Sequence, residues 1–365
     1  MAKAALVEFW QDWQGVLGTI RVLDPACGSG AFLIEAFDQL HREYRAANSR
    51  LDELRGHAEL FDLDRLILQQ NLYGVDLNDE AIEICRLSLW IKTAAQGKPL
   101  TSLDHTIRAG NSVVSDAAVH PKAFNWQAAF PEVFANGGFD VVIGNPPYIR
   151  QEWLSPFKPY LEEHFRSYHG MADLYVYFYE LGVQMLRPGG LLSYVVTNKW
   201  MRAGYAEPLR RLFQGETWVE SVVDFGHAKQ IFPDADVFPS IVVVRKPRDV
   251  APPAMTRVCA IPRDELRVND LQSQIDQIGV SVERTRLGAG PWSLEDDAAE
   301  KLMQRIAGDW TSLSEFVGAK PLRGILTGFN EAFLIDSATR KSLTEAGPEC
   351  SEIVRPFVRG QDLGR

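Results

Sequence analysis

The stretch that most constrains this chain is residues 139–148, FDVVIGNPPY. Its apolar, β-branched first half predicts a buried strand, which ends directly at an amide, two prolines and an aromatic side chain. Proline fixes φ and has no N–H group, so the end of this strand is stiff and its carbonyl oxygens stay available to a ligand. The stretch therefore predicts a strand whose end is a functional site, with Asn145 as a side-chain acceptor.

Strands and helices are predicted to alternate as far as about residue 215, and two further strands then follow with no helix between them. This order favours an α/β fold with a seven-stranded, mostly parallel sheet and an antiparallel hairpin at one edge. The expected strands are 19–24, 71–76, 105–111, 139–143, 191–197, 219–225 and 238–245, and the main expected helices end near 44, 95, 186 and 213.

A proline-rich segment, residues 247–253, is the best candidate for a domain boundary because hydrophobic periodicity disappears there. We therefore expect one domain over residues 1–247 and a second region over residues 248–365. The second region combines a helical stretch near 294–306 with a glycine-punctuated strand segment at 324–333.

Composition excludes several classes of protein. The chain has 365 residues and four cysteines, which show neither C-x-x-C nor metal-ligand spacing, so we expect no disulfide framework and no metal. No apolar run is long enough to span a membrane and no signal peptide is visible, so a cytoplasmic protein without membrane contact is expected.

The net charge of −10 argues against a nucleic-acid partner at first, because phosphate binding depends on Lys and Arg. Four basic residues nevertheless cluster after the expected fifth strand and are hypothesised to contact DNA phosphate: Lys199, Arg202, Arg210 and Arg211. An ordinary solvated helix face explains the same cluster equally well.

Two further strand ends carry acidic residues. Asp24 ends the first strand and precedes a turn with Gly28 and Gly30, and Asp76 ends the second strand, where a doubly wound sheet commonly binds a ribose. The turn is not G-x-G-x-x-G, and no lysine follows it as a phosphate cradle requires. The expected ligand therefore has a ribose and little phosphate charge.

The joint pattern of DPACGSGAF at 24–32 and NPPY at 145–148 resembles the gamma-class N6-adenine DNA methyltransferases that use S-adenosylmethionine. The resemblance continues in order over roughly residues 19–246, and it implies a Rossmann-like fold. Residues 324–333 and 355–362 resemble the start of the target-recognition region in long methylases of single-polypeptide restriction-modification and phage-defence systems.

The resemblance implies roles for individual residues. It assigns catalysis to Asn145, Pro146, Pro147 and Tyr148, and stacking on a flipped base to Tyr148 and Phe232. It assigns cofactor binding to Asp24, Ala26, Gly28, Gly30, Asp76, Leu77, Asn111 and Phe178. Asn111 replaces the acid usual at that point, and Phe178 and Phe232 could equally be packing residues.

Other functions remain open. An NPPY tip also serves methyltransferases that act on RNA bases or on protein glutamine, and a non-catalytic DNA-recognition subunit could keep the same fold. Phe32 and the large C-terminal extension favour double-stranded DNA as the partner. The chain is also hypothesised to be a fragment of a longer polypeptide that could hold a nuclease or a helicase.

Overall fold

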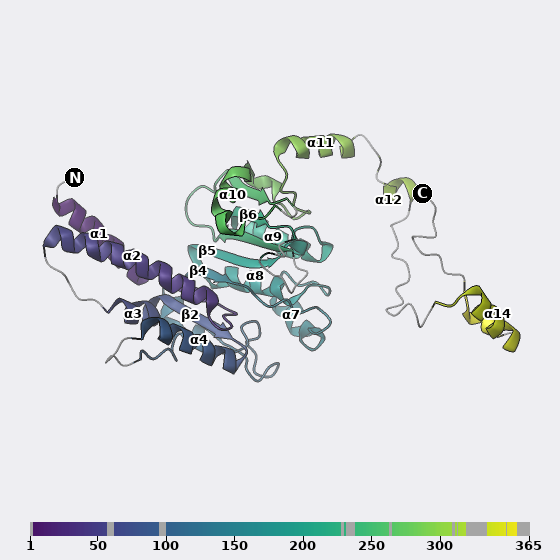
Figure 1. Ribbon diagram of the computed structural model, residues 1–365, viewed down its shortest axis with the longest axis horizontal. Coiled ribbons are helices and arrows are strands. Elements are labelled where there is room, and N and C mark those ends of the chain that lie inside the picture. The colour runs from purple at the N-terminus through teal and green to yellow at the C-terminus, as the bar shows by residue number, and fades with distance from the viewer. Residues whose placement is uncertain are drawn as a thin grey trace. The chain divides into compact units, whose positions relative to one another are not determined.

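The structure is a computed structural model that describes residues 3–56, 62–94, 100–227, 230, 238–262, 265–308, 311, 313–318, 334–347 and 349–355 (Figure 1). The chain divides into two compact units, Met1–Leu302 and Met303–Arg365. Within the described ranges, no helix is both long and apolar enough to cross a membrane.

The first unit contains a mixed sheet with the strand order β3-β2-β1-β4-β5-β7-β6-β8-β9. The strands are β1 (Val22–Asp24), β2 (Leu72–Asp76), β3 (Ile107–Ala109), β4 (Phe139–Gly144), β5 (Leu186–Thr197), β6 (Trp218–Asp224), β7 (Pro239–Arg245), β8 (Met255–Ala260) and β9 (Val280–Glu283). Strands β1 to β5 pair parallel with one another. This arrangement confirms the expected Rossmann-like α/β class.

The expected count of seven strands and the expected position of the antiparallel pair are both wrong. The sheet has nine strands in the described part of the chain, and β7 lies antiparallel between β5 and β6. β6 is not an edge strand, because β8 pairs parallel to its outer side and β9 pairs antiparallel to β8. The short, half-polar strands β8 and β9 give weak periodic signals, so pattern alone did not reveal them.

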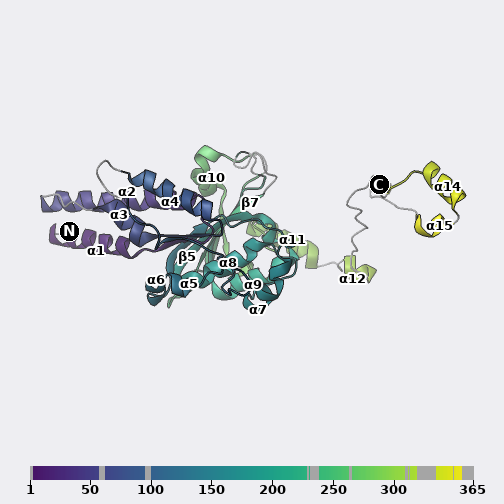
Figure 2. The ribbon, with the colours of Figure 1, turned by 90° about the horizontal axis from the view of Figure 1, so that it is seen from below.

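Helices cover both faces of the sheet. Figure 2 shows α2 and α4 on one face and α8 and α9 on the other. The main helices are α1 (Lys3–Thr19), α2 (Ala31–Arg55), α3 (Leu63–Leu66), α4 (Asp79–Thr93), α5 (Trp126–Ala129), α6 (Pro131–Ala135), α7 (Lys158–His164), α8 (Leu174–Met185), α9 (Glu207–Glu216), α10 (Leu271–Ile278), α11 (Asp297–Gly308), α12 (Leu313–Val317), α14 (Ser337–Ala346) and α15 (Cys350–Ile353).

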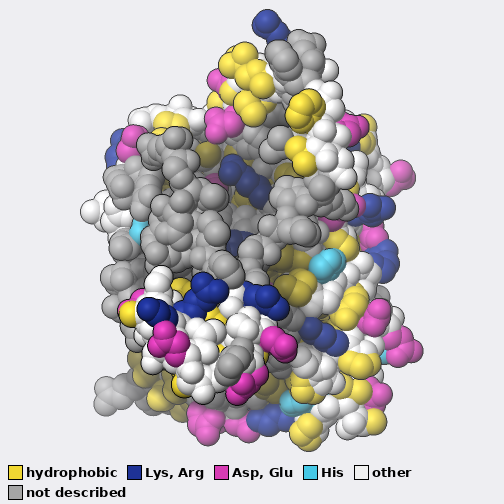
Figure 3. All heavy atoms as spheres, turned by 90° about the vertical axis from the view of Figure 1, so that its right-hand side faces the viewer, with side chains coloured by type: hydrophobic (Ala, Val, Ile, Leu, Met, Phe, Trp, Pro, Cys, Tyr) yellow, Lys and Arg dark blue, Asp and Glu magenta, His cyan; other side chains and the backbone are white. Residues whose placement is uncertain are grey.

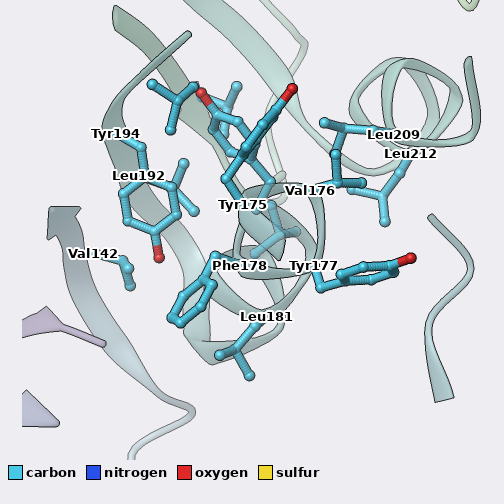
Figure 4. Close-up of a cluster of buried hydrophobic side chains, with 14 of the residues drawn as sticks. Val142, Tyr175, Val176, Tyr177, Phe178, Leu181, Leu192, Tyr194, Leu209 and Leu212 are labelled. Carbon is cyan, nitrogen blue, oxygen red and sulfur yellow. The ribbon is translucent and has the colours of Figure 1, made fainter. Parts of the chain in front are cut away.

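Helix α8 is the central helix of the larger core. Its sequence, LYVYFYELGVQM, is apolar on nearly every side, which is typical of a helix buried all round. Figure 4 shows its aromatic and aliphatic side chains packed between Val142 of β4, Leu192 and Tyr194 of β5, and Leu209 and Leu212 of α9. This packing fixes the start of α8 beside the end of β4.

The packed unit extends beyond the boundary expected near residue 247. Trp292 is 1% exposed, and its ring lies 5.0 Å from that of Trp200 in the same core. The backbone N–H of Trp292 also donates to the Met201 carbonyl at 2.8 Å. The proline-rich segment 247–253 is therefore a connection within the unit, whose end lies at Leu302. The expected strand at 324–333 lies outside the described residues.

Candidate functional site

The order of the strands creates a natural crevice. Consecutive strands run outward from β1 in one direction and from β4 in the other, so β1 and β4 are neighbours whose connections diverge. Ligands of open α/β sheets bind at such a switch point, outside the carboxyl ends of the strands.

A cavity of about 450 Å³ opens at this point. Seven of the residues expected in the site line it: Ala26, Asp76, Leu77, Asn111, Asn145, Pro147 and Phe178. Its size falls in the range of small-molecule and cofactor pockets. The structure therefore brings together residues from the ends of four strands and from α8, although they are up to about 150 positions apart in the chain.

The glycine turn between β1 and α2 is held in place by close packing and by a hydrogen bond. Gly30 has φ of 89°, and a Cβ atom there would lie 2.6 Å from the Cys85 sulfur, so only glycine fits. The N–H of Gly28 donates to Asp76 Oδ2 at 2.9 Å, which ties the turn to the end of β2. Gly28 and Gly30 shape the pocket from behind its lining.

Asp24 also lies behind the lining and is 1% exposed. Its Oδ1 accepts a hydrogen bond from the Ala26 N–H at 3.0 Å. Burial raises the pKa of the Asp24 carboxyl, the Ala26 hydrogen bond lowers it and the nearby Asp76 charge raises it, with a net pKa of about 7. A Cβ at Gly144 would lie 2.6 Å from Asp24 Oδ1, so the carboxyl sits directly against the end of β4.

Asp76 and Asn111 both use oxygen atoms to hold backbone turns. Asp76 Oδ1 accepts from the Asn78 N–H at 2.9 Å. Asn111 Oδ1 accepts from the N–H groups of Val113 and Val114, both at 3.1 Å. The Asn111 amide nitrogen has no partner among the described residues, so a pocket ligand would meet a hydrogen-bond donor there.

Phe178 lies both in the core and at the cavity wall. It is 5% exposed and belongs to the core cluster around α8, yet it also borders the cavity (Figure 4). It is a core residue whose ring forms part of the pocket wall.

The end of β4 presents two free acceptors. Asn145 is exposed, and neither its side chain nor the Pro146 carbonyl has a hydrogen-bond partner in the part of the chain that the structure describes. Both acceptors belong to the stiff, proline-containing tip. They are available to the two N–H groups of an amine or amide.

Tyr148 is held in a defined orientation next to these acceptors. Its hydroxyl donates to the Val195 carbonyl of β5 at 3.3 Å, and its ring meets Tyr175 edge-on with centroids 6.2 Å apart. Burial raises the pKa of the Tyr148 hydroxyl to about 12. The residue remains 38% exposed, so the ring can receive a planar group.

Sequence reasoning missed much of the apolar wall of the cavity. The additional lining residues include Val113, Val114, His120, Ile149, Trp153, Leu154, Phe157 and Leu161. Several of them follow the NPPY tip, in a segment without helical or strand periodicity. Their apolar character directly after a candidate site was the available signal.

The four basic candidates have different environments. Lys199 and Arg202 are exposed, and exposed Arg211 pairs with Glu207 at 2.7 Å. Arg210 is only 2% exposed, and its guanidinium donates to the carbonyls of Trp200, Ala203 and Ala289. Because these bonds occupy it inside the core, Arg210 is not available to DNA phosphate.

One face of the protein is mixed in charge. On the face shown in Figure 3, Lys and Arg side chains (dark blue) lie among Asp and Glu side chains (magenta). Phe232, the second expected stacking residue, lies outside the described residues. Within the described ranges, no group of three or more His, Cys, Asp or Glu side chains could hold a metal ion.

Residues 70–232 match the family model of the Eco57I restriction-modification methylases, and residues 10–106 match a methyltransferase-domain family described as RMKL-like. The type II restriction enzyme and methyltransferase RM.Eco57I of Escherichia coli is 28% identical over 62% of the chain. The type II methyltransferase M.XhoI of Xanthomonas vasicola is 25% identical over 92% of the chain. The chain spans 24% and 60% of the lengths of these two relatives.

A solved structure shares the fold. The type IIL restriction-modification enzyme MmeI, in complex with DNA, has a TM-score of 0.53 and 17% sequence identity, covering 77% of this chain and 36% of that one. At this identity the similarity shows the fold alone.

The methyl donor of this methylase class is S-adenosylmethionine, and the pocket fits it. The glycine turn has no lysine for a diphosphate, whereas acidic side chains stand at the ends of β1 and β2. A cavity of about 450 Å³ with largely apolar walls suits an adenosyl group. Residues 70–232 therefore match a restriction-modification methylase domain of the Eco57I type.

Proposed function

We propose that this domain transfers a methyl group from S-adenosylmethionine to N6 of an adenine that has left the DNA duplex. One observation carries the proposal: Asn145, whose side chain has no partner among the described residues, lines the cavity that fits the methyl donor, and the Pro146 carbonyl follows it in the chain. The gamma-class resemblance of the NPPY tip agrees with this assignment.

The two acceptors explain how an aromatic amine becomes reactive. The N6 lone pair of adenine is delocalised into the ring, which makes the nitrogen a poor nucleophile. Hydrogen bonds from its two N–H groups to the Asn145 side-chain oxygen and the Pro146 carbonyl would favour tetrahedral geometry and localise the pair. S-adenosylmethionine supplies an electrophilic methyl group, and holding the amine beside it supplies much of the rate.

Several side chains would hold the cofactor. We assign the ribose to Asp76, and the methionine end to the segment that contains Asp24, Ala26, Gly28 and Gly30. Leu77, Asn111 and Phe178 would surround the adenine of the cofactor, with Asn111 offering its free amide nitrogen. No metal is assigned to the site.

Base flipping follows from the position of the acceptors at a strand end, because a base inside a duplex could not reach them. Tyr148 would stack on one face of the flipped adenine, since its ring is held by Val195 and Tyr175 and remains partly exposed. We assign the other face to Phe232 by resemblance. Lys199, Arg202 and Arg211 remain candidates for phosphate contacts.

The wider assembly is also a proposal. We propose double-stranded DNA as the partner. Because the curated relatives are longer than this chain, we also propose that it belongs to a longer polypeptide that could include nuclease or helicase parts. We assign target recognition to residues 248–365, of which β8 and β9 join the methylase sheet.

Methyl transfer tests the proposal directly. The chain is incubated with tritiated S-adenosylmethionine in three separate reactions, which contain genomic DNA, total RNA or a mixture of denatured proteins. We expect label in N6-methyladenine of DNA, and a fall in kcat of about 100-fold or more for Asn145→Ala, comparable to losing a preorganised hydrogen-bond partner.

The control is Asn136→Ala, which changes an exposed asparagine at the end of α6, away from the pocket. This variant should keep wild-type activity. Label in RNA or in glutamine instead of DNA would contradict the substrate, and full activity of Asn145→Ala would contradict the mechanism. A wild-type chain that binds DNA without any transfer would indicate a recognition subunit.

A further inference from the structure

Arg150 lies two residues after Tyr148, and Lys199 lies four residues after Val195, whose carbonyl accepts the hydrogen bond of the Tyr148 hydroxyl. Both cations are exposed, and neither side chain has a hydrogen bond or ion pair among the described residues. Other basic groups nearby are engaged: Lys158 donates to Gln151 Oε1 and the Gly170 carbonyl, and Arg211 pairs with Glu207. Arg150 and Lys199 therefore differ from Lys158 and Arg211 in having no side-chain partner among the described residues.

The backbone of Arg150 is fixed on both sides. The Ile149 carbonyl accepts a hydrogen bond from the Leu174 N–H at 2.9 Å. The Gln151 N–H donates to Asp173 Oδ1 at 3.0 Å. These two bonds attach the segment after Tyr148 to the start of α8. They hold the Arg150 backbone next to the NPPY tip and leave the Arg150 side chain without a hydrogen bond.

Lys199 is fixed in a similar way. It lies in the 3-10 turn η3 (Asn198–Met201), directly after β5. The Asn198 N–H donates to the Phe238 carbonyl at 2.7 Å, and the Lys199 carbonyl accepts from the Ala203 N–H at 2.9 Å. The backbone on both sides of the Lys199 side chain is thus hydrogen-bonded, and the ammonium group is left without a partner.

Hydrogen bonds attach the segments of both cations to the surroundings of Tyr148: Gln151, next to Arg150, donates to Asp173, and Tyr148 itself donates to Val195, four residues before Lys199. Burial raises the pKa of the Asp173 carboxyl, while the charges of Lys199 and Arg150 act in the opposite direction. Both cations are therefore within electrostatic reach of the same carboxylate, at the N-terminus of α8.

We propose that Arg150 and Lys199 bind the two DNA phosphates that flank the flipped nucleotide. This inference rests on the proposed function, because a base that stacks on Tyr148 brings its own phosphates to this rim. A guanidinium can bind a phosphate through two parallel hydrogen bonds, and an ammonium acts as a point charge. The two cations hold the strand while the tip holds the base.

Arg202 is the third exposed arginine or lysine without a side-chain partner in this part of the described chain, but no interaction places its guanidinium beside Asp173. The proposed phosphate clamp, meaning the two cations that bind the flanking phosphates, therefore consists of Arg150 and Lys199. Arg202 would make at most an outer phosphate contact.

The test uses the full chain and a fluorescent mixed-sequence DNA duplex. The dissociation constant is measured by anisotropy over a series of salt concentrations for wild type, Arg150→Gln, Lys199→Gln and the double variant. Each single variant should reduce the slope of log K against log salt by about one, and the double variant by about two. Arg150→Lys should keep the slope and bind more weakly, because it keeps the charge and loses the paired bonds.

The control is Arg50→Gln, which removes a charge on α2 that is paired with Glu53 at 2.9 Å. It should leave the slope unchanged, and all variants should keep wild-type affinity for S-adenosylmethionine. Unchanged slopes in both single variants, with DNA bound by wild type, would overturn the clamp alone. Absence of DNA binding by wild type would overturn both the clamp and the proposed function.

Discussion

The carboxyl of Asp24 combines a position next to the cavity-lining residue Ala26 with an environment that disfavours its charge. Burial raises its pKa to about 7, from an ordinary value near 3.8. A cofactor ammonium placed beside it would favour the ionised form. The same buried carboxyl therefore costs stability without a ligand and would strengthen ligand binding, a combination typical of functional residues.

We predict that Asp24→Asn becomes more stable relative to wild type as the pH rises. Between about pH 4 and pH 7 the unfolded chain loses the Asp24 proton while the folded chain keeps it, so the wild-type free energy of unfolding falls with pH. The difference between variant and wild type should increase by about 4 kcal/mol across this window. Urea unfolding at pH 4 and pH 8 measures it.

An amide does not titrate in this pH range. A pH-dependent difference in the free energy of unfolding between the two proteins is therefore due to Asp24. A constant difference between the two proteins would show that Asp24 is ionised in the folded chain. Binding of S-adenosylmethionine to the variant should weaken at the same time, which unfolding alone does not report.

At the scale of elements, the end of β5, the helix α9 and the segment around Trp292 form one interlocked group. Trp292 packs on Trp200 and Phe213, and Arg210 joins the same group by donating to the Ala289 carbonyl. A buried arginine whose donors reach only carbonyls acts as a clamp within the fold. This group carries Lys199 at its edge, so packing in the core positions a proposed DNA contact.

Trp292→Ala should lower the free energy of unfolding by about 3–5 kcal/mol, because it removes a fully buried aromatic side chain. Trp153→Ala provides the matched comparison, since Trp153 is 78% exposed and its loss should change stability by less than about 1 kcal/mol. Chemical denaturation of both variants gives the two values. Equal effects of the two substitutions would contradict the packing of Trp292.

At the largest scale, the methylase sheet and residues 248–302 belong to one compact unit. β8 pairs with β6 along four residues, and β9 completes the edge. Removal of this region would expose β6 as an edge strand and uncover the aromatic core near Trp200. Exposed strand edges and apolar surface favour aggregation.

A chain truncated after residue 247 should therefore aggregate or unfold, whereas a chain truncated after Leu302 should keep a cooperative unfolding transition. Size-exclusion chromatography and thermal denaturation of the two products distinguish them. A monomeric, cooperatively unfolding product that ends at residue 247 would restore the boundary expected from the prolines.

The sequence by itself determined the fold class, the first seven strands and the tip of β4, because alternating apolar runs, glycines and prolines act locally and leave local patterns. It also singled out Asn145, Asp24 and Asp76, which mark the ends of strands. Only the folded structure shows which of these side chains share a cavity, because local sequence patterns do not determine the order of the strands in the sheet.

Tertiary structure also decided that Arg210 is an internal clamp and that Trp292 belongs to the methylase core. The sequence predicted Arg210 to contact DNA phosphate and placed position 292 in a second region, because burial depends on neighbours far along the chain. Arg150 became notable for the same reason. Its unpaired charge indicates a function only in the company of Tyr148, Asp173 and Lys199. The packing of α8 against β4 and β5 brings these residues together.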